Sequence, residues 1–196
     1  MRRLLLATRN PGKVREYRHL LRGVPFWLTT LAARKLREEA PEPGTSYEEN
    51  AVAKATFYAR LSGLPALADD SGLEVDALGG EPGIRSARYP GSTDEERYRR
   101  LLREMVQVPW AGRTARFVCV IALVTPEGQV EARRGQCAGY VALAPQGKLG
   151  FGYDPVFCLP ELSKTMAQLS LAEKSRLSHR GEAALQMRPV LEALGQ

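Results

Sequence analysis

The sequence predicts an α/β fold built around a mixed β-sheet. Apolar runs typical of buried strands alternate with helical patterns over the first half of the chain. A long segment at 113–125, dense in β-branched residues, then leads through the turn Pro126-Glu127-Gly128 into a second predicted strand. Alternating strands and helices favour parallel pairing, whereas two strands joined by a tight turn favour an antiparallel hairpin. We therefore expect both kinds of pairing in one sheet.

Local patterns place the elements of the first half. Apolar runs indicate buried strands, apolar residues at helical spacing indicate helices, and the capping box Ser46-Tyr47-Glu48-Glu49 marks a helix start. In order, we expect a strand at 4–8, a helix at 13–22, a strand at 26–30, a Pro-rich loop at 38–44, a helix at 46–61, a short strand from 64 that ends at Asp69-Asp70, and an alternating segment at 73–78 that could continue as a strand.

The elements of the second half follow from the same signals. Capping boxes at 93–96 and 170–173 each predict a helix start, the second for a helix of a single turn. We expect a helix at 93–106, strands at 113–125 and 130–139, and a final helix from Ser178 that is kinked by Pro189.

Composition limits the class of protein. The 196 residues are 44% hydrophobic and 26% charged, which fits one globular domain over residues 1–196, or one domain with two lobes. No apolar run approaches the length that spans a membrane, and the run after Arg2-Arg3 is too short for a signal peptide. We expect a cytoplasmic protein with no membrane partner.

The charge and the cysteine content limit the kinds of molecule that we expect the protein to bind. The formal net charge of +6 suits partners that carry phosphate. The basic residues are interleaved with acids, as at 94–100, which is typical of a solvated helix face and not of a nucleic-acid-binding stripe. The three cysteines contain no C-x-x-C pair, which argues against zinc and thioredoxin-type chemistry. We expect a small nucleotide as partner and no nucleic acid.

The most informative segment is Leu67-Ala68-Asp69-Asp70-Ser71-Gly72, where an apolar run meets two adjacent carboxylates. Adjacent acids repel each other, and burial disfavours their ionised form. A magnesium ion would offset this cost, because Mg²⁺ binds one or two carboxylates and completes its shell with water and phosphate oxygens. The alternative is a strand that ends in a solvated acidic turn.

Other segments supply the remaining parts of a nucleotide site. The loop before Gly12 and Lys13 leads into a helix, whose N-terminus favours an anion, although the P-loop pattern is absent and a plain surface loop is the alternative. The turn 151–155 offers an aromatic face for a base, and Lys174 and His179-Arg180 offer donors. A carboxylate can activate water for attack on phosphorus. Together these parts predict an enzyme that processes nucleotides.

Six segments occur in a fixed order over nearly the whole chain: Thr8-Arg9-Asn10-Pro11-Gly12-Lys13; Glu48-Glu49-Asn50-Ala51 with Lys54-Ala55; Ala68-Asp69-Asp70-Ser71-Gly72-Leu73; Leu78-Gly79-Gly80-Glu81-Pro82-Gly83-Ile84 with Ser86-Ala87-Arg88-Tyr89; Phe151-Gly152-Tyr153-Asp154-Pro155; and Glu173-Lys174-Ser175 with Ser178-His179-Arg180. In this order and spacing they resemble the non-canonical purine nucleoside triphosphate pyrophosphatases, the inosine triphosphate pyrophosphatase or RdgB-like family.

The resemblance implies an activity and a fold. The expected reaction is the Mg²⁺-dependent hydrolysis of inosine, deoxyinosine or xanthosine triphosphate between the α and β phosphates, which yields the monophosphate and pyrophosphate. The expected fold is an elongated mixed sheet flanked by helices in two lobes, with a central nucleotide cleft. The resemblance also implies a homodimer.

The resemblance further implies roles for individual residues. Asp70 matches the general base and a metal carboxylate, with Asp69 beside it. Glu42 matches the second magnesium carboxylate, and Glu39 is the alternative. The implied substrate contacts are Thr8, Arg9, Asn10, Pro11, Gly12 and Lys13 in the phosphate loop, Phe151, Gly152, Tyr153 and Asp154 in the base-binding turn, Lys174, His179 and Arg180 for base and phosphate, and Ser71 as a further contact. His179 and Arg180 can donate to the 6-keto oxygen of hypoxanthine, so we expect them to set the choice of base.

Several points stay open at this level. Arg9 stands where the family often has Gly, and its cation either adds attraction for phosphate or points outward. Asn50 and Lys54 lie one helical turn apart and either reach the site or line the helix surface. A related Maf-type pyrophosphatase is the alternative enzyme, which the Ser-His-Arg and Phe-Gly-Tyr-Asp elements argue against. A nucleic-acid-binding module is the alternative from another class, and the chain lacks a recognisable motif for it.

Overall fold

A computed structural model describes residues 2–195 and divides the chain into two compact units. Unit 1 comprises Met1–Asp70, Cys119–Gly135 and His179–Gln196, and unit 2 comprises Ser71–Val118 and Gln136–Ser178. The strands form a mixed seven-stranded sheet in the order β2-β1-β3-β4-β5-β6-β7. The strands β3 (Ala66–Val75), β4 (Thr114–Val124) and β5 (Val130–Val141) each contribute residues to both units. The α/β class and the mixed sheet are therefore confirmed.

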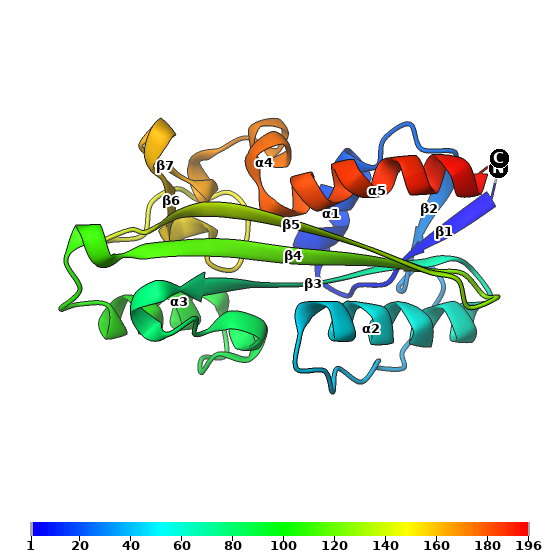
Figure 1. The fold of residues 1–196 in the computed structure, drawn as a ribbon, viewed down its shortest axis with the longest axis horizontal. Coiled ribbons are helices and arrows are strands. Elements are labelled where there is room, and N and C mark those ends of the chain that lie inside the picture. The colour runs from blue at the N-terminus through cyan, green and yellow to red at the C-terminus, as the bar shows by residue number, and fades with distance from the viewer. Residues whose placement is uncertain (1, 196) are drawn as a thin grey trace. The chain divides into compact units, whose positions relative to one another are not determined.

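In unit 1, helices cover both faces of the sheet. The strand β1 (Arg2–Leu6) pairs in parallel with β2 (Phe26–Thr30) on one side and with β3 on the other. The helices α1 (Pro11–Leu20) and α5 (His179–Gly195) lie on one face, and α2 (Tyr47–Ser62) lies on the opposite face (Figure 1). The buried face under α1 and α5 is formed by Leu4, Leu6, Tyr17, Leu21, Leu67, Cys119, Ile121, Leu123, Ala184, Met187 and Leu191.

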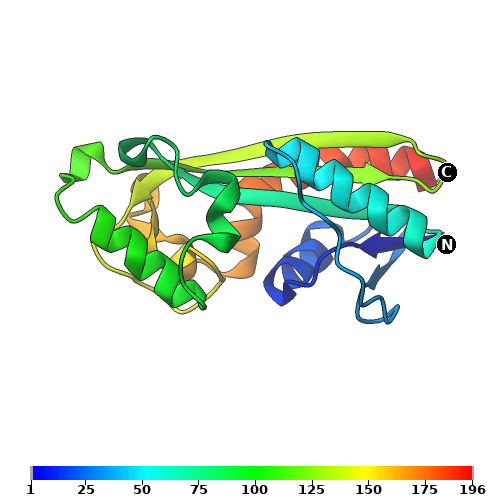
Figure 2. The same cartoon turned by 90° about the horizontal axis from the view of Figure 1, so that it is seen from below.

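Side chains at the ends of the unit 1 helices fix where the helices begin. Asn10 caps α1, since its Oδ1 accepts from the amides of Gly12 and Lys13 at 2.8 and 3.1 Å, and Pro11 supplies a favourable first residue. Ser46 caps α2 by accepting from the amide of Glu49 at 3.2 Å. The long segment between β2 and α2 runs back along α2 before the helix starts (Figure 2).

Unit 2 has its own apolar core. The helix α3 (Asp94–Glu104) contributes Leu101 to a cluster that also holds Leu73 and Val75 of β3. The short strands β6 (Phe157–Leu159) and β7 (Lys164–Thr165) extend the sheet by antiparallel pairing from β5. The helix α4 (Leu171–Leu177) begins at a capping box of Ser170 and Glu173 and presents Lys174 in its first turns.

The structure confirms the strand at 26–30, the capped helix from residue 46 and the hairpin of β4 and β5. One prediction was wrong in a way that matters, because the acidic pair does not end a strand. The strand β3 runs on through Asp69 and Asp70 to Val75, since Leu73 and Val75 bury their side chains in the unit 2 core. The short strands β6 and β7 were not predicted.

Smaller differences occur at other element ends. The first strand covers Arg2–Leu6 and not 4–8, and α1 starts two residues earlier than predicted because Asn10 and Pro11 initiate it. The helix α4 has seven residues, more than a single turn. Pro189 lies inside α5, which continues to Gly195. None of the helices described over residues 2–195 combines the length and the apolar character that a membrane crossing requires.

Candidate functional site

The two adjacent carboxylates of β3 point to opposite faces of the sheet. Successive side chains of a strand alternate between faces, so Asp69 shares the face of Leu67, which packs with α1 and α5. Asp70 faces α2, where the side-chain amide of Asn50 donates to its Oδ2 at 3.0 Å. The sequence suggested one paired acidic site, whereas the structure shows separate partners for the two acids.

Asp69 is the centre of a buried ionic cluster in unit 1. Its Oδ2 accepts from Lys13 Nζ at 3.0 Å and from Arg180 Nη2 and Nε at 3.1 and 3.3 Å. Asp69 and Arg180 are each only 1% exposed. Burial alone would raise the pKa of Asp69, but the charges of Lys13, Arg180 and Lys54 outweigh burial and hold this pKa well below its usual range. Asp69 is therefore a fixed anion.

Glu16 completes this cluster, and no pattern in the sequence indicated its role. Its Oε2 accepts from Arg180 Nη1 at 2.7 Å, and its side chain is buried. Arg180 thus bridges two carboxylates. Burial would lower the pKa of Arg180, but Asp69 and Glu16 raise it well above its usual value. The buried thiol of Cys119 lies 3.8 Å from Asp69 Oδ2, and burial, followed by the charge of Asp69, raises the pKa of Cys119 to about 12.

The loop from Thr8 to Lys13 leads into the N-terminus of α1 as predicted. Several of its backbone amides, however, already donate hydrogen bonds to side chains of the same loop. The amides of Gly12 and Lys13 donate to Asn10 Oδ1, and the amide of Asn10 donates to Thr8 Oγ1 at 3.2 Å. What this loop offers an anion is the positive end of the helix dipole and the ammonium of Lys13. Arg9 is exposed, and its guanidinium bonds the carbonyl oxygens of Leu36 and Glu38.

On the α2 face, Asn50 and Lys54 belong to the site. Asn50 is buried and donates to Asp70. Lys54 Nζ donates to the carbonyl oxygen of Asp69 at 3.1 Å and pairs with the carboxylate of Glu42. Burial would lower the pKa of Lys54, but the charge of Asp69 and the bond to Glu42 raise it. Of the two interpretations of Asn50 and Lys54, the structure supports contact with the site.

Asp70 has an environment unlike that of its neighbour. Burial raises the pKa of Asp70, against the lowering effects of the Asn50 hydrogen bond and of Lys13 and Lys54. Its carboxylate is half-buried. Because burial disfavours the ionised form of this carboxyl group, the group is suited to accept a proton or to bind a cation.

The donors on this face fit a magnesium ion. Over residues 2–195 no three His, Cys, Asp or Glu side chains gather into a complete ligand set. Mg²⁺ commonly uses only one or two protein carboxylates and takes its other ligands from water and phosphate. Asp70 and Glu42 supply hard oxygen donors, and Glu42 already faces the positive charge of Lys54. Glu39, the alternative to Glu42, is exposed.

In unit 2, the side chain of Asp154 stabilises the turn from Phe151 to Asp154. Asp154 Oδ2 accepts from the amide of Phe151 at 2.8 Å and pairs with the ammonium of Lys174, and both charged side chains are buried. Lys174 Nζ lies 4.8 Å from the centre of the Phe151 ring. The amide of Gly152 donates to Asp94 at 2.7 Å. The ring of Phe151, only partly buried, is thereby held in place.

Three other predicted site residues have clear positions. Tyr153 is a core residue of unit 2, because it is buried and its hydroxyl donates to the carbonyl oxygen of Ser86 at 3.0 Å. Ser71 follows Asp70 within β3 and is half-buried. His179 is the buried first residue of α5. The start of α5 passes so close to β5 that a Cβ at Gly135 would overlap the carbonyl oxygen of His179.

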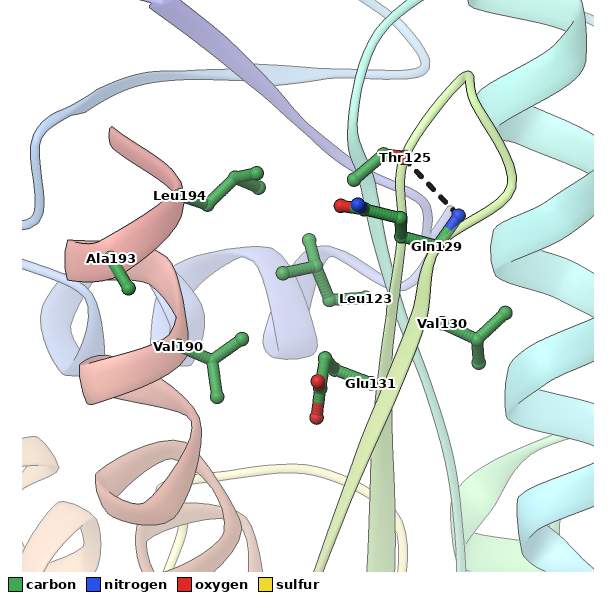
Figure 3. A pocket seen from close by; sticks show the side chains of 8 residues that line it. All are labelled: Leu123, Thr125, Gln129, Val130, Glu131, Val190, Ala193 and Leu194. Carbon is green, nitrogen blue, oxygen red and sulfur yellow. Dashed lines mark hydrogen bonds between the residues drawn. The ribbon is translucent and has the colours of Figure 1, made fainter. Parts of the chain in front are cut away.

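A separate hollow of about 580 Å³ lies in unit 1, between the β4–β5 hairpin and α5 (Figure 3). Its walls are mostly apolar, and Glu131 is its one charged residue. The amide of Gln129 donates to Thr125 Oγ1 at its rim. Its lining includes none of the site residues predicted from sequence, and consists of Leu123, Thr125, Gln129, Val130, Glu131, Val190, Ala193 and Leu194. We assign no catalytic role to this hollow.

Comparison with known proteins identifies the family. The Ham1 family model matches residues 4–190. A dITP/XTP pyrophosphatase of Symbiobacterium thermophilum is 49% identical over 193 residues, which is 98% of this chain and 96% of that protein. One from Thermus thermophilus is 51% identical over 97% of this chain and 91% of that protein. A solved Ham1 protein from Coxiella burnetii is 38% identical, has a TM-score of 0.87, and the match covers 98% of this chain and 100% of that chain. The chain belongs to the Ham1 family.

Proposed function

We propose that this protein is a nucleoside triphosphate pyrophosphatase that hydrolyses inosine, deoxyinosine and xanthosine triphosphates to the monophosphate and pyrophosphate. The observation that carries the proposal is the separation of Asp69 and Asp70. One acid is locked among cations, and the other, whose pKa is raised, faces Asn50 in the neighbourhood of Lys54 and Glu42. The dITP/XTP pyrophosphatases that resemble the chain over nearly its full length support the same reaction.

In this proposal Asp70 is the general base. Its raised pKa favours proton uptake from an attacking water, and its half-exposed carboxylate is accessible to one. Asp69 is too well stabilised as an anion to take a proton, so we assign it to the orientation of Lys13 and Arg180. We therefore propose that Asp70, and not Asp69, receives the proton.

Mg²⁺ is the proposed cofactor, with Asp70 and Glu42 as its protein ligands. When bound, the ion would neutralise the charge of the phosphate oxygens. Lys54 keeps the carboxylate of Glu42 next to α2, and Asn50 keeps Asp70 oriented from the same helix. The chain itself therefore places both acids before any cation arrives.

The remaining substrate contacts are proposed from the family resemblance and the local geometry. Lys13 attracts the triphosphate at the positive end of α1, with Thr8 and Asn10 shaping the loop. The ring of Phe151 stacks on the purine, backed by Lys174 and Asp154. Ser71 and His179 add polar contacts. We further propose that the chain acts as a homodimer in the cytoplasm.

A nucleotide panel tests the proposed function. Purified protein is incubated with Mg²⁺ and inosine, xanthosine, adenosine or guanosine triphosphate, and pyrophosphate and orthophosphate are measured separately. We expect pyrophosphate from the inosine and xanthosine nucleotides and little from the adenosine nucleotide. Release of orthophosphate with a diphosphate as co-product would refute the proposed bond specificity. Binding of random single-stranded DNA without turnover would support the nucleic-acid-binding alternative.

A further inference from the structure

The exposed residue Arg9 bonds a neighbouring loop in unit 1. Its Nη2 donates to the carbonyl oxygen of Glu38 at 2.8 Å and lies 3.4 Å from that of Leu36. The same carbonyl oxygen of Glu38 accepts from the hydroxyl of Tyr58, on α2, at 2.8 Å. Two donors from separate elements thus converge on one backbone oxygen of an exposed segment.

The far end of this segment is fixed as well. The amide of Gly44 donates to Asn50 Oδ1 at 2.8 Å, and the amide of Thr45 donates to Glu49 Oε2 at 2.7 Å. Asn50 is the residue whose amide group also donates to Asp70. The stretch from 38 to 44 is therefore attached at both ends to elements that carry the site, and Glu42 lies between the two attachments.

We propose that Arg9 is a positioning residue that, together with Tyr58, fixes the start of the 38–44 loop and so holds Glu42 ready for the metal. The inference rests on the proposed function in so far as Glu42 binds Mg²⁺. It assigns a purpose to a residue that departs from the Gly common in the family. A glycine at this position has no side chain to reach Glu38, whereas the guanidinium can bond two carbonyl oxygens at once.

This assignment competes with the expectation that Arg9 attracts the triphosphate. The two roles make different demands on the side chain. Attraction of phosphate needs only a positive charge, which Lys would also supply. Both bonds of Arg9 come from Nη2, which lies one covalent bond further from the backbone than the Nζ of a lysine, so the contact with Glu38 needs the longer side chain of Arg. The variants Arg9→Ala and Arg9→Lys therefore separate the two roles.

The first experiment measures the loop in the absence of metal and nucleotide. Native protein is digested with a protease that cleaves after Glu, and cleavage after Glu38 and Glu39 is followed by mass spectrometry. Loss of a charge-assisted hydrogen bond should raise the cleavage rate by roughly five- to tenfold in Arg9→Ala. Tyr58→Phe should act in the same direction, because it removes the other donor to Glu38.

A matched control comes from the same unit. Arg188 also bonds two backbone carbonyl oxygens, those of Leu20 at the end of α1 and of Arg22 after it, at 3.0 and 3.1 Å. Arg188→Ala should leave cleavage within the 38–44 loop unchanged. If Arg188→Ala exposed this loop as much as Arg9→Ala does, the effect would be general destabilisation, and the proposal would be overturned.

The second experiment measures the magnesium requirement. Arg9→Ala should raise the Mg²⁺ concentration needed for half-maximal hydrolysis of inosine triphosphate by roughly fivefold or more, while the KM for nucleotide at saturating Mg²⁺ stays within about twofold of wild type. Arg9→Lys should resemble Arg9→Ala in both experiments. A raised nucleotide KM that Lys restores, with unchanged loop cleavage, would overturn the proposal in favour of phosphate attraction. If wild-type protein hydrolysed no nucleotide, the proposed function would fail, and the cleavage rates alone would decide the role of Arg9 in the loop.

Discussion

Arg180 binds Asp69 through two of its nitrogens, and both side chains are almost fully buried. The third guanidinium nitrogen bonds Glu16 at 2.7 Å. From sequence we expected Arg180 to contact the base and to set base choice, and the structure instead shows it bridging two carboxylates. Arg180→Ala should therefore lower turnover of every nucleotide to a similar degree, because the variant disturbs Asp69 and not the recognition of the base. Initial rates with inosine, adenosine and guanosine triphosphates check this, and a selective loss with the inosine nucleotide would restore the base-contact role.

Asp70→Asn is expected to reduce turnover by roughly a hundredfold or more, because the amide lacks the basicity and the charge that the proposed reaction needs. The fold should tolerate this change, since Asp70 carries its charge at a cost. Steady-state kinetics with inosine triphosphate and circular dichroism check both parts. Activity within a few-fold of wild type in a folded variant would remove Asp70 from the mechanism.

The raised pKa of Asp70 also predicts a pH-dependent stability difference in metal-free protein. At pH 7 the wild type holds a partly buried charge that Asp70→Asn lacks, so the variant should be the more stable of the two. As the pH falls through the raised pKa towards about 4, the wild-type carboxyl takes up a proton and the difference should shrink. Urea unfolding of both proteins at several pH values measures this difference in the free energy of unfolding. A variant that is less stable at pH 7 would contradict the assigned environment.

Glu16→Gln is expected to lower the free energy of unfolding by about 3 kcal/mol, because it leaves Arg180 with less compensating charge in a buried position. Glu131→Gln is the control, since Glu131 pairs with Arg133 at 3.0 Å on the surface, where such a pair contributes about 1 kcal/mol or less. Urea unfolding of both variants makes the comparison. Equal effects would show that Glu16 is not a member of a buried network.

Phe151→Leu is expected to raise the KM for inosine triphosphate by roughly five- to a hundredfold, because it keeps apolar bulk but removes an aromatic face for the base. The Mg²⁺ concentration for half-maximal activity should not change. Initial-rate measurements over a range of nucleotide and metal concentrations separate the two constants. An unchanged KM would mean that the ring of Phe151 only packs beside Lys174.

The local sequence pattern correctly predicted those features of the site that depend only on contacts between residues close together in the chain. A helix directly after the loop of Asn10 was correctly predicted, although it begins at Pro11 and not at Lys13, because capping is a local interaction. The pair Asp69-Asp70 was interpreted as the end of a strand because Ser71-Gly72 favours a turn. The burial of Leu73 and Val75 in unit 2 overrode that local preference, and only a continuing strand turns the two acids to opposite faces.

The charge network could not be predicted from sequence for a physical reason. Glu16 lies next to Arg15 on a helix where Arg15 and Arg18 are exposed, and its partner Arg180 is 164 residues away. Arg9 and Glu38 are likewise separated by 29 residues, so neither contact leaves a local pattern. Pairing over such distances depends on the tertiary fold.

The most direct test of the account is hydrolysis of inosine triphosphate in H₂¹⁸O with Mg²⁺, followed by mass spectrometry of the products. The proposed reaction places the attacking water on the α-phosphorus, with Asp70 as the base that receives its proton. We predict that ¹⁸O enters the phosphate of inosine monophosphate and that the pyrophosphate stays unlabelled. Label in the pyrophosphate, or in orthophosphate released with a diphosphate, would contradict the account.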